Sequence, residues 1–116
     1  MADITIYHKP TCSTCRQVIK LVEESGQPFT VINYYEKPFS KSMLKGLLKK
    51  AGLKAPDIIR RKEEIYKKLN LQQSQFTDDE FLDIMIKHPD LIQRPLVQKE
   101  DHVILARPPE TVGKIL

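Results

Sequence analysis

The chain has 116 residues, with 19 Lys and Arg against 15 Asp and Glu, which gives a formal net charge of +4. That length predicts one domain over residues 1–116. A composition of 41% hydrophobic and 29% charged residues is typical of globular rather than disordered proteins. The positive charge favours anionic partners. Direct binding of nucleic acid is not expected, because acidic and apolar residues interrupt the basic clusters.

The sequence predicts neither a membrane-spanning segment nor a targeting segment. Its longest uninterrupted apolar run is residues 103–106, whereas a spanning helix needs about 20 residues. Residues 1–3 lead directly into an alternating apolar pattern, without the charged and then apolar stretch of a signal peptide. We therefore expect a cytoplasmic protein with no membrane partner.

The first third of the chain predicts a strand–helix–strand unit. Residues 4–7 alternate and are rich in β-branched and aromatic side chains, as in a strand. From Cys15 onward the apolar residues follow helical spacing, and Ser25 and Gly26 supply a stop. Residues 29–33 predict a second strand, which such a unit normally makes parallel to the first.

The middle of the chain predicts helices. One apolar stripe between Ser40 and Gly52 consists of Met43, Leu44, Leu47 and Leu48. Residues 56–69, with Ile58, Ile59, Ile65 and Leu69, predict one broken helix or two short ones. Residues 77–80 form a capping box at the start of a helix that ends at residues 88–89.

The last third predicts a hairpin of residues 96–98 and 102–105, followed by a short helix over residues 108–116. The whole order predicts an α/β sandwich with a four-stranded mixed sheet. It resembles a thioredoxin-like fold that carries a helical insertion after its second strand.

Cys12 and Cys15 form a Cys-X-X-Cys motif in the predicted turn between the first strand and the first helix. The amides of a first helical turn lack internal partners and carry partial positive charge. They stabilise a thiolate and can also bind a tetrahedral oxyanion. We predict that Cys12 is the exposed nucleophile and that Cys15 lies on the first turn. His8 is close enough in sequence to stabilise the thiolate electrostatically.

Two other interpretations of the pair are possible. Free cysteines are commonly buried and behave as small apolar residues. A structural zinc site needs four ligands, of which the pair supplies two. No metal site is expected, because His8 is too close to the pair while His88 and His102 are isolated.

Arg60, Arg94 and Arg107 each lie at a boundary between predicted elements. The planar guanidinium donates two parallel hydrogen bonds, which suits tetrahedral oxyanions, although local sequence alone favours three solvated surface arginines. Pro95 follows Arg94. We predict a cis bond between them, because proline permits it and a cis proline lies beside the cysteine loop in thioredoxin-like folds.

Along nearly its full length the chain resembles the arsenate reductases of the glutaredoxin-coupled, thioredoxin-fold type. The resemblance rests on residues 4–8, Pro10, Cys12, Arg60, 76–79, 88–89, 91–95 and 107–108. It implies that Cys12 attacks arsenate, that Arg60, Arg94 and Arg107 hold the oxyanion, and that His8 lowers the pKa of the nucleophile. The resemblance therefore favours the functional interpretation of the arginines.

The resemblance also implies a reaction. Cys12 displaces an oxygen of arsenate, a second thiol attacks, arsenite leaves, and an outside donor reduces the resulting disulfide. No bound cofactor is implied, and the reductant is glutathione, a glutaredoxin or a thioredoxin. Well-known glutathione-using members lack a cysteine at the position of Cys15. A resolving cysteine here would let an internal disulfide form between Cys12 and Cys15.

Two alternatives to the reductase stay open. Spx-type regulators share the fold and the Cys-X-X-Cys pair, which serves there as a redox switch, and they bind the α subunit of RNA polymerase. A general thiol–disulfide oxidoreductase would use the pair without arsenate. The three arginines favour the reductase, because a regulator has no need of guanidinium groups that converge on the sulfur.

Overall fold

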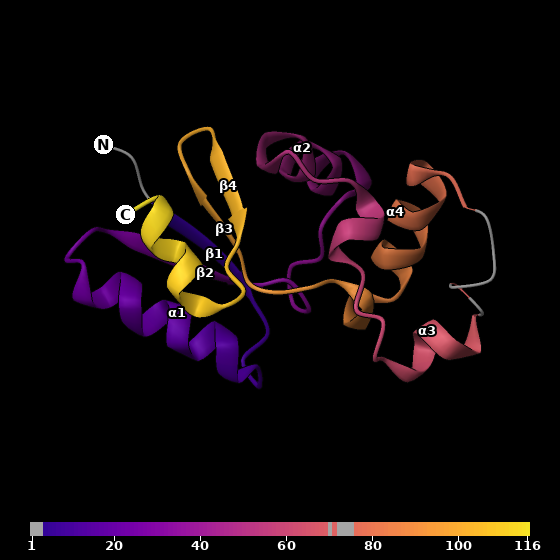
Figure 1. The fold of residues 1–116 in the computed structure, drawn as a ribbon, viewed down its shortest axis with the longest axis horizontal. Helices are drawn as coiled ribbons and strands as arrows, with labels where there is room; N and C mark the ends of the chain where they lie inside the picture. Colours follow the sequence, from indigo (N-terminus) through magenta and orange to yellow (C-terminus); the bar gives the residue numbers. More distant parts are fainter. Residues whose placement is uncertain (1–3, 70, 72–75) are drawn as a thin grey trace. The chain divides into compact units, whose positions relative to one another are not determined.

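Strands lie toward both ends of the chain, and helices occupy its middle (Figure 1). The computed structural model describes residues 4–69, 71 and 76–116. The chain divides into two compact units. One, the sheet unit, consists of the described residues up to 37 together with residues 94–116, and the other, the insertion unit, is Pro38–Gln93. The insertion follows the second strand, where the sequence predicts it. A single domain over residues 1–116 stays a prediction.

The sheet unit contains a four-stranded mixed sheet in the order β2-β1-β3-β4, which confirms the predicted sheet and its closing hairpin. The strands are β1 (Ile4–His8), β2 (Phe29–Asn33), β3 (Leu96–Lys99) and β4 (His102–Leu105). β1 pairs in parallel with β2 and antiparallel with β3. Because the parallel register pairs His8 with Asn33, β1 and β2 end at the same edge of the sheet.

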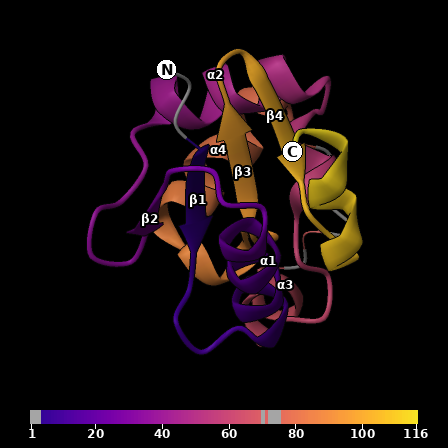
Figure 2. The same cartoon turned by 90° about the vertical axis from the view of Figure 1, so that its left-hand side faces the viewer.

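Two helical elements cover one face of this sheet. α1 (Ser13–Glu24) and the 3-10 helix η3 (Pro109–Lys114) lie side by side over it (Figure 2). As predicted, Cys12 precedes this helix, and it takes the N-cap position of α1. The predicted last helix is a 3-10 helix, shorter than residues 108–116.

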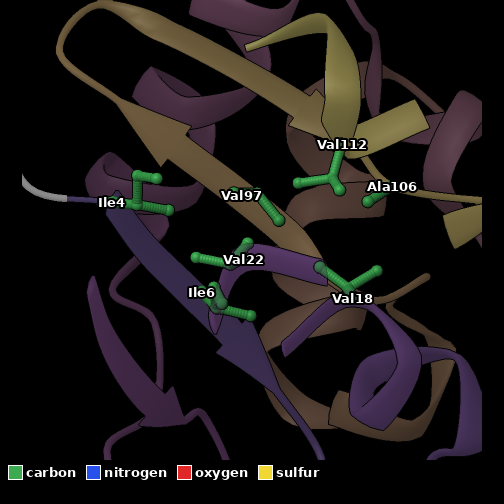
Figure 3. Close-up of a cluster of buried hydrophobic side chains, with 7 residues drawn as sticks. All are labelled: Ile4, Ile6, Val18, Val22, Val97, Ala106 and Val112. Atoms are coloured by element: carbon green, nitrogen blue, oxygen red, sulfur yellow. The ribbon is translucent and has the colours of Figure 1, made fainter. Parts of the chain in front are cut away.

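The core of the sheet unit lies between the sheet and these two helical elements. Seven side chains with no exposed area point toward one another (Figure 3): Ile4, Ile6, Val18, Val22, Val97, Ala106 and Val112. The strand residues recur every second position and those of α1 every fourth, as the two periodicities require. Burial of each Val or Ile stabilises the fold by roughly 1.5–3 kcal/mol relative to exposure. The cysteine loop is thus attached to a packed sheet and helix.

The insertion unit is helical, as predicted. Its elements are α2 (Lys41–Ala51), η1 (Ala55–Ile58), α3 (Glu64–Lys68), α4 (Asp78–Lys87) and η2 (Pro89–Leu91). Ser40 caps α2 by accepting a hydrogen bond from the Met43 amide at 3.1 Å. Gly52 ends α2 in the left-handed region, at φ 71°, which costs glycine little. The two short elements η1 and α3 occupy the region of residues 56–69, which agrees with the second of the two predicted alternatives.

The capping box of α4 is confirmed. Thr77 Oγ1 accepts from the Glu80 amide at 3.2 Å, and Glu80 Oε1 accepts from the Thr77 amide at 3.0 Å. Two apolar side chains are more exposed than their patterns predict, Met43 at 39% and Leu69 at 38%. Met43 lies at the edge of the α2 stripe, and Leu69 follows the end of the five-residue helix α3, so neither faces inward.

Candidate active site

The cysteine loop connects β1 to α1. The Cys12 amide donates to the Lys9 carbonyl at 3.0 Å, which closes the turn after the strand. Cys12 is the N-cap of α1, and its Sγ accepts a hydrogen bond from the Cys15 amide at 3.4 Å. Cys15 lies on the first turn of α1, as predicted. Cys12 is partly buried rather than exposed, because its sulfur turns back onto the helix N-terminus.

The surroundings of Cys12 favour the thiolate. Burial by itself would raise the pKa of Cys12, but hydrogen bonds from the Cys15 thiol and amide, with a hydrogen bond and the charge of Arg94, bring it below its ordinary value. These are donors and a cation directed at one sulfur, and such groups stabilise the charged form. The sulfur of Cys12 is therefore the more nucleophilic of the two.

Cys15 has the opposite character. Its side chain has no exposed area. The pKa of the Cys15 thiol is raised to about 12, mainly by burial. A hydrogen bond with the Lys9 backbone lowers this pKa, the hydrogen bond and negative charge of Cys12 raise it, and the charge of Arg94 lowers it slightly. Cys15 thus keeps its proton and donates it toward Cys12. The pair is polarised into one thiolate and one thiol, both cysteines being free.

Arg94 is a buried charged side chain, with 6% of its surface exposed. Its Nη1 donates to Tyr34 Oη at 3.2 Å, and its guanidinium also hydrogen bonds to Cys12. Burial disfavours the charge, but Tyr34, Tyr35 and Cys12 outweigh it, so the pKa of Arg94 lies above its ordinary value. The Arg94–Pro95 peptide bond is cis, as predicted.

Arg107 joins the same region through its side chain. Its Nη1 donates to the backbone carbonyl of Arg94 at 3.0 Å, although the residue is exposed. The Arg107–Pro108 bond is also cis, which the sequence reading did not predict. The structure thus brings Cys12, Cys15, Arg94 and Arg107 together within the sheet unit.

Arg60 belongs to the insertion unit. It follows η1 in an extended segment rather than in a helix, and its amide donates to the Leu91 carbonyl at 2.7 Å. Its Nε forms an ion pair with Glu63 Oε1 at 3.0 Å. Glu63 therefore neutralises part of the charge that an oxyanion would need.

His8 is the last residue of β1, at the same sheet edge as the cysteine loop. Burial lowers the pKa of His8 below its ordinary value, so the imidazole is mostly neutral near pH 7. Its Nδ1 is buried and has no hydrogen-bond partner among the residues that the structure describes. A neutral ring offers the Cys12 thiolate a single N–H hydrogen-bond donor rather than a full positive charge.

Tyr34 and Tyr35 are the parts of this site that the sequence reading missed. They follow β2, at the edge where His8 ends β1. That edge supplied a usable signal, because the carboxyl ends of adjacent parallel strands are where α/β folds gather functional side chains. Two aromatic residues with hydroxyl groups just past a strand are therefore candidates for this site on the sequence alone.

Neither a membrane-spanning helix nor a metal cluster is found in residues 4–69, 71 and 76–116. No helix in this part of the chain is long and apolar enough to cross a bilayer. No three His, Cys, Asp or Glu side chains there lie close enough together to hold a metal ion.

The parallel β1–β2 pair, the antiparallel hairpin and the cysteine loop at the start of α1 define a thioredoxin-like protein with a thiol-based site. The chain belongs to the ArsC family, whose model matches residues 7–115.

Several bacterial proteins are similar to the chain over most of its length. An arsenate reductase of Acidiphilium multivorum is 40% identical over 116 residues, which are all of this chain and 82% of that protein. A solved structure of an arsenate reductase from Vibrio cholerae superposes with a TM-score of 0.93 at 41% identity, covering 99% of this chain and 98% of that one. YfgD, an uncharacterised protein of Escherichia coli K12, is 36% identical over 98% of this chain and 97% of its own length.

Proposed function

We propose that the chain is an oxidoreductase that reduces arsenate to arsenite, with Cys12 as the nucleophile. The observation that carries the proposal is the Cys12 sulfur at the N-terminus of α1, with a lowered pKa and a hydrogen bond from Arg94. The thiolate is the reactive form of cysteine. The proposal is supported by arsenate reductases that are about 40% identical over the whole chain.

In the first step the Cys12 thiolate attacks the arsenic atom of arsenate. A bond forms between Sγ and arsenic while an arsenic–oxygen bond breaks, and the oxygen leaves as water after protonation. Arsenic remains in the +5 state in this adduct. Guanidinium groups stabilise the charge on the remaining oxygens because they are held in place before the reaction.

In the second step a thiol attacks the sulfur of Cys12. A disulfide bond forms, the sulfur–arsenic bond breaks, and its electron pair stays on arsenic, which leaves as arsenite in the +3 state. Two thiol sulfurs thus lose the two electrons that arsenic gains. Cys15 is the nearest candidate, since its thiol already hydrogen bonds to Cys12.

The adduct itself would activate Cys15. The negative charge of Cys12 is one of the causes that raise the pKa of Cys15, after burial. Once the Cys12 sulfur is bonded to arsenic it no longer carries that charge, so the proton on Cys15 leaves more easily. An outside dithiol, from a thioredoxin or glutaredoxin system, or glutathione would then reduce the disulfide between Cys12 and Cys15.

The arginines and His8 have proposed roles in this scheme. Arg94 and Arg107, which belong to the sheet unit, bind oxygens of the oxyanion. Arg60 adds a further hydrogen bond to the oxyanion once its guanidinium leaves Glu63. His8 assists the ionisation of Cys12 by a hydrogen bond. Pro95 has a structural role beside the cysteine loop.

The Spx-type alternative, with the α subunit of RNA polymerase as partner, is not favoured. The similar proteins from Acidiphilium multivorum, Escherichia coli and Vibrio cholerae are named arsenate reductases. A regulator would also not require an arginine hydrogen bonded to the Cys12 sulfur.

The test is arsenate-dependent oxidation of NADPH, with the thioredoxin and the glutaredoxin systems supplied in turn. Cys12→Ser should lower turnover roughly a thousandfold or more with both systems, as loss of a covalent nucleophile does. Cys15→Ser should abolish turnover with thioredoxin and retain part of it with glutathione and glutaredoxin, because glutathione can replace the second thiol.

Thr14→Ala is the matched control, since it alters the same loop without removing a thiol, and it should retain most of the activity. Wild-type protein without arsenate-dependent NADPH oxidation, but with reduction of a model disulfide, would favour the general thiol–disulfide oxidoreductase. Equal losses for Cys12→Ser and Cys15→Ser with every reductant would contradict the separate roles of the two thiols.

A further inference from the structure

The backbone fixes Tyr34 at the edge of the sheet. Its amide donates to the His8 carbonyl at 3.3 Å, which extends the pairing of β1 and β2 by one residue. Hydrogen bonds to the side chain and to the backbone carbonyl of Asn33 close the turn that follows. Asn33 Oδ1 accepts from the Tyr35 amide at 2.9 Å, and the Asn33 carbonyl accepts from the Lys37 amide at 2.9 Å. The position of the Tyr34 backbone is therefore set by the end of the strand.

The side chain of Tyr34 is equally fixed. It is 1% exposed, and its ring lies 5.0 Å from that of Tyr35, at an interplanar angle of 38°. Lys9 Nζ lies 4.9 Å from the centre of the Tyr35 ring, so the cysteine loop contacts this aromatic pair. A buried tyrosine hydroxyl usually finds a hydrogen-bond partner. Here the hydroxyl oxygen accepts from Arg94 Nη1 at 3.2 Å.

Arg94 therefore lies between two partners, the Tyr34 hydroxyl and the Cys12 sulfur. An arginine side chain has many rotamers, and a buried one holds a single orientation only if its contacts select it. Cys12 alone cannot hold the Arg94 guanidinium in one orientation, because its sulfur is the reacting atom and changes its charge and its bonds during a thiol reaction. The Tyr34 hydroxyl is a contact that does not take part in such chemistry.

We propose that Tyr34 is a positioning residue of the site, which holds the Arg94 guanidinium against the Cys12 sulfur. A phenol hydroxyl is uncharged when it accepts this hydrogen bond, unlike the carboxylate that pairs with Arg60. The contact therefore orients Arg94 without neutralising it. The charge of Arg94 therefore stays available for the Cys12 thiolate. It is also available for the oxyanion, a part of the inference that rests on the proposed function.

The test is the variant Tyr34→Phe, which keeps the ring and removes the hydroxyl. Alkylation of Cys12 by iodoacetamide is followed by mass spectrometry across pH, since only the thiolate reacts. We expect the midpoint to rise by roughly half a unit or more. We also expect kcat/KM for arsenate to fall about tenfold, the usual scale of one lost hydrogen bond to a charged group.

Tyr66→Phe is the matched control, because Tyr66 is also a buried tyrosine but belongs to the insertion unit. It should leave the midpoint of Cys12 unchanged. A double-mutant cycle with Arg94→Gln separates positioning from general loss of stability. If Tyr34 acts through Arg94, Tyr34→Phe should not shift the midpoint further in the Arg94→Gln background.

An unchanged or lowered midpoint in Tyr34→Phe, or a full additional shift in the double variant, would overturn the inference. The alkylation needs no arsenate, so the two proposals fail separately. A raised midpoint in a protein that does not reduce arsenate would support the role of Tyr34 and reject the arsenate reductase.

Discussion

The two compact units hold their candidate arginines in different ways. In the sheet unit, Arg94 is 6% exposed and its guanidinium contacts an uncharged hydroxyl and the sulfur of Cys12. In the insertion unit, Arg60 is partly exposed and forms an ion pair with Glu63 three residues away. The same residue type thus serves as a charge directed at a thiolate in one unit and as half of a local ion pair in the other. What an arginine can do depends on its partner, which sequence spacing does not reveal.

Among changes to these arginines and their partners, the largest effect should come from Arg94→Ala, which removes the buried arginine of the sheet unit. We expect a higher pKa of Cys12 and a fall in kcat/KM for arsenate of roughly tenfold to a hundredfold, because one hydrogen bond to a charged group is lost on each of two partners. Steady-state kinetics with saturating reductant measures the effect. Turnover retained at low arsenate concentration would contradict the role of Arg94.

A smaller effect should separate Arg60 from Glu63. Glu63→Gln releases Arg60 from its ion pair, so the KM for arsenate should fall a few-fold, while Arg60→Ala should raise it by a similar factor. The pair is partly exposed, so its loss should cost the fold less than about 1 kcal/mol. If Arg60→Ala and Glu63→Gln both leave KM unchanged, Arg60 takes no part in anion binding.

The smallest effect should be confined to the fold of the insertion unit. Thr77→Ala removes the hydroxyl that caps α4 and should lower the free energy of unfolding by about 1 kcal/mol. Urea unfolding measures this change. The alkylation midpoint of Cys12 should not move, and a shift in it would show that the cysteine loop depends on the cap of α4.

Most of the fold could be predicted from short-range patterns. Alternation in residues 4–7 and helical spacing from Val18 to Val22 identified the elements that form the core of the sheet unit, because each pattern follows from the geometry of its own element. The helix starts at Ser40 and Thr77 could be predicted for the same reason. Met43 and Leu69 are more exposed than predicted, because Met43 lies at the edge of its apolar stripe and Leu69 follows the end of a short helix.

The site could be predicted only in part. Cys12 and Cys15 follow from a local motif, whereas the cis bond before Pro95 follows from the resemblance to a thioredoxin-like fold. The hydrogen bond between Arg94 and Tyr34 joins residues 60 positions apart, and the ion pair of Arg60 depends on the turn that follows η1. The contact with Tyr34 leaves no trace in local spacing, so the role of Tyr34 is visible only in three dimensions, whereas the ion pair joins residues only three positions apart.

The most direct test of the account is alkylation of both cysteines of the wild-type protein as a function of pH, resolved by mass spectrometry. Cys12 should react with a midpoint below the ordinary value for a cysteine, because donors and the Arg94 charge stabilise its thiolate. With its pKa at about 12, only about one Cys15 in ten thousand is ionised four units lower, at pH 8, so Cys15 should stay unmodified there. Equal midpoints for the two thiols, or modification of Cys15 first, would contradict the account.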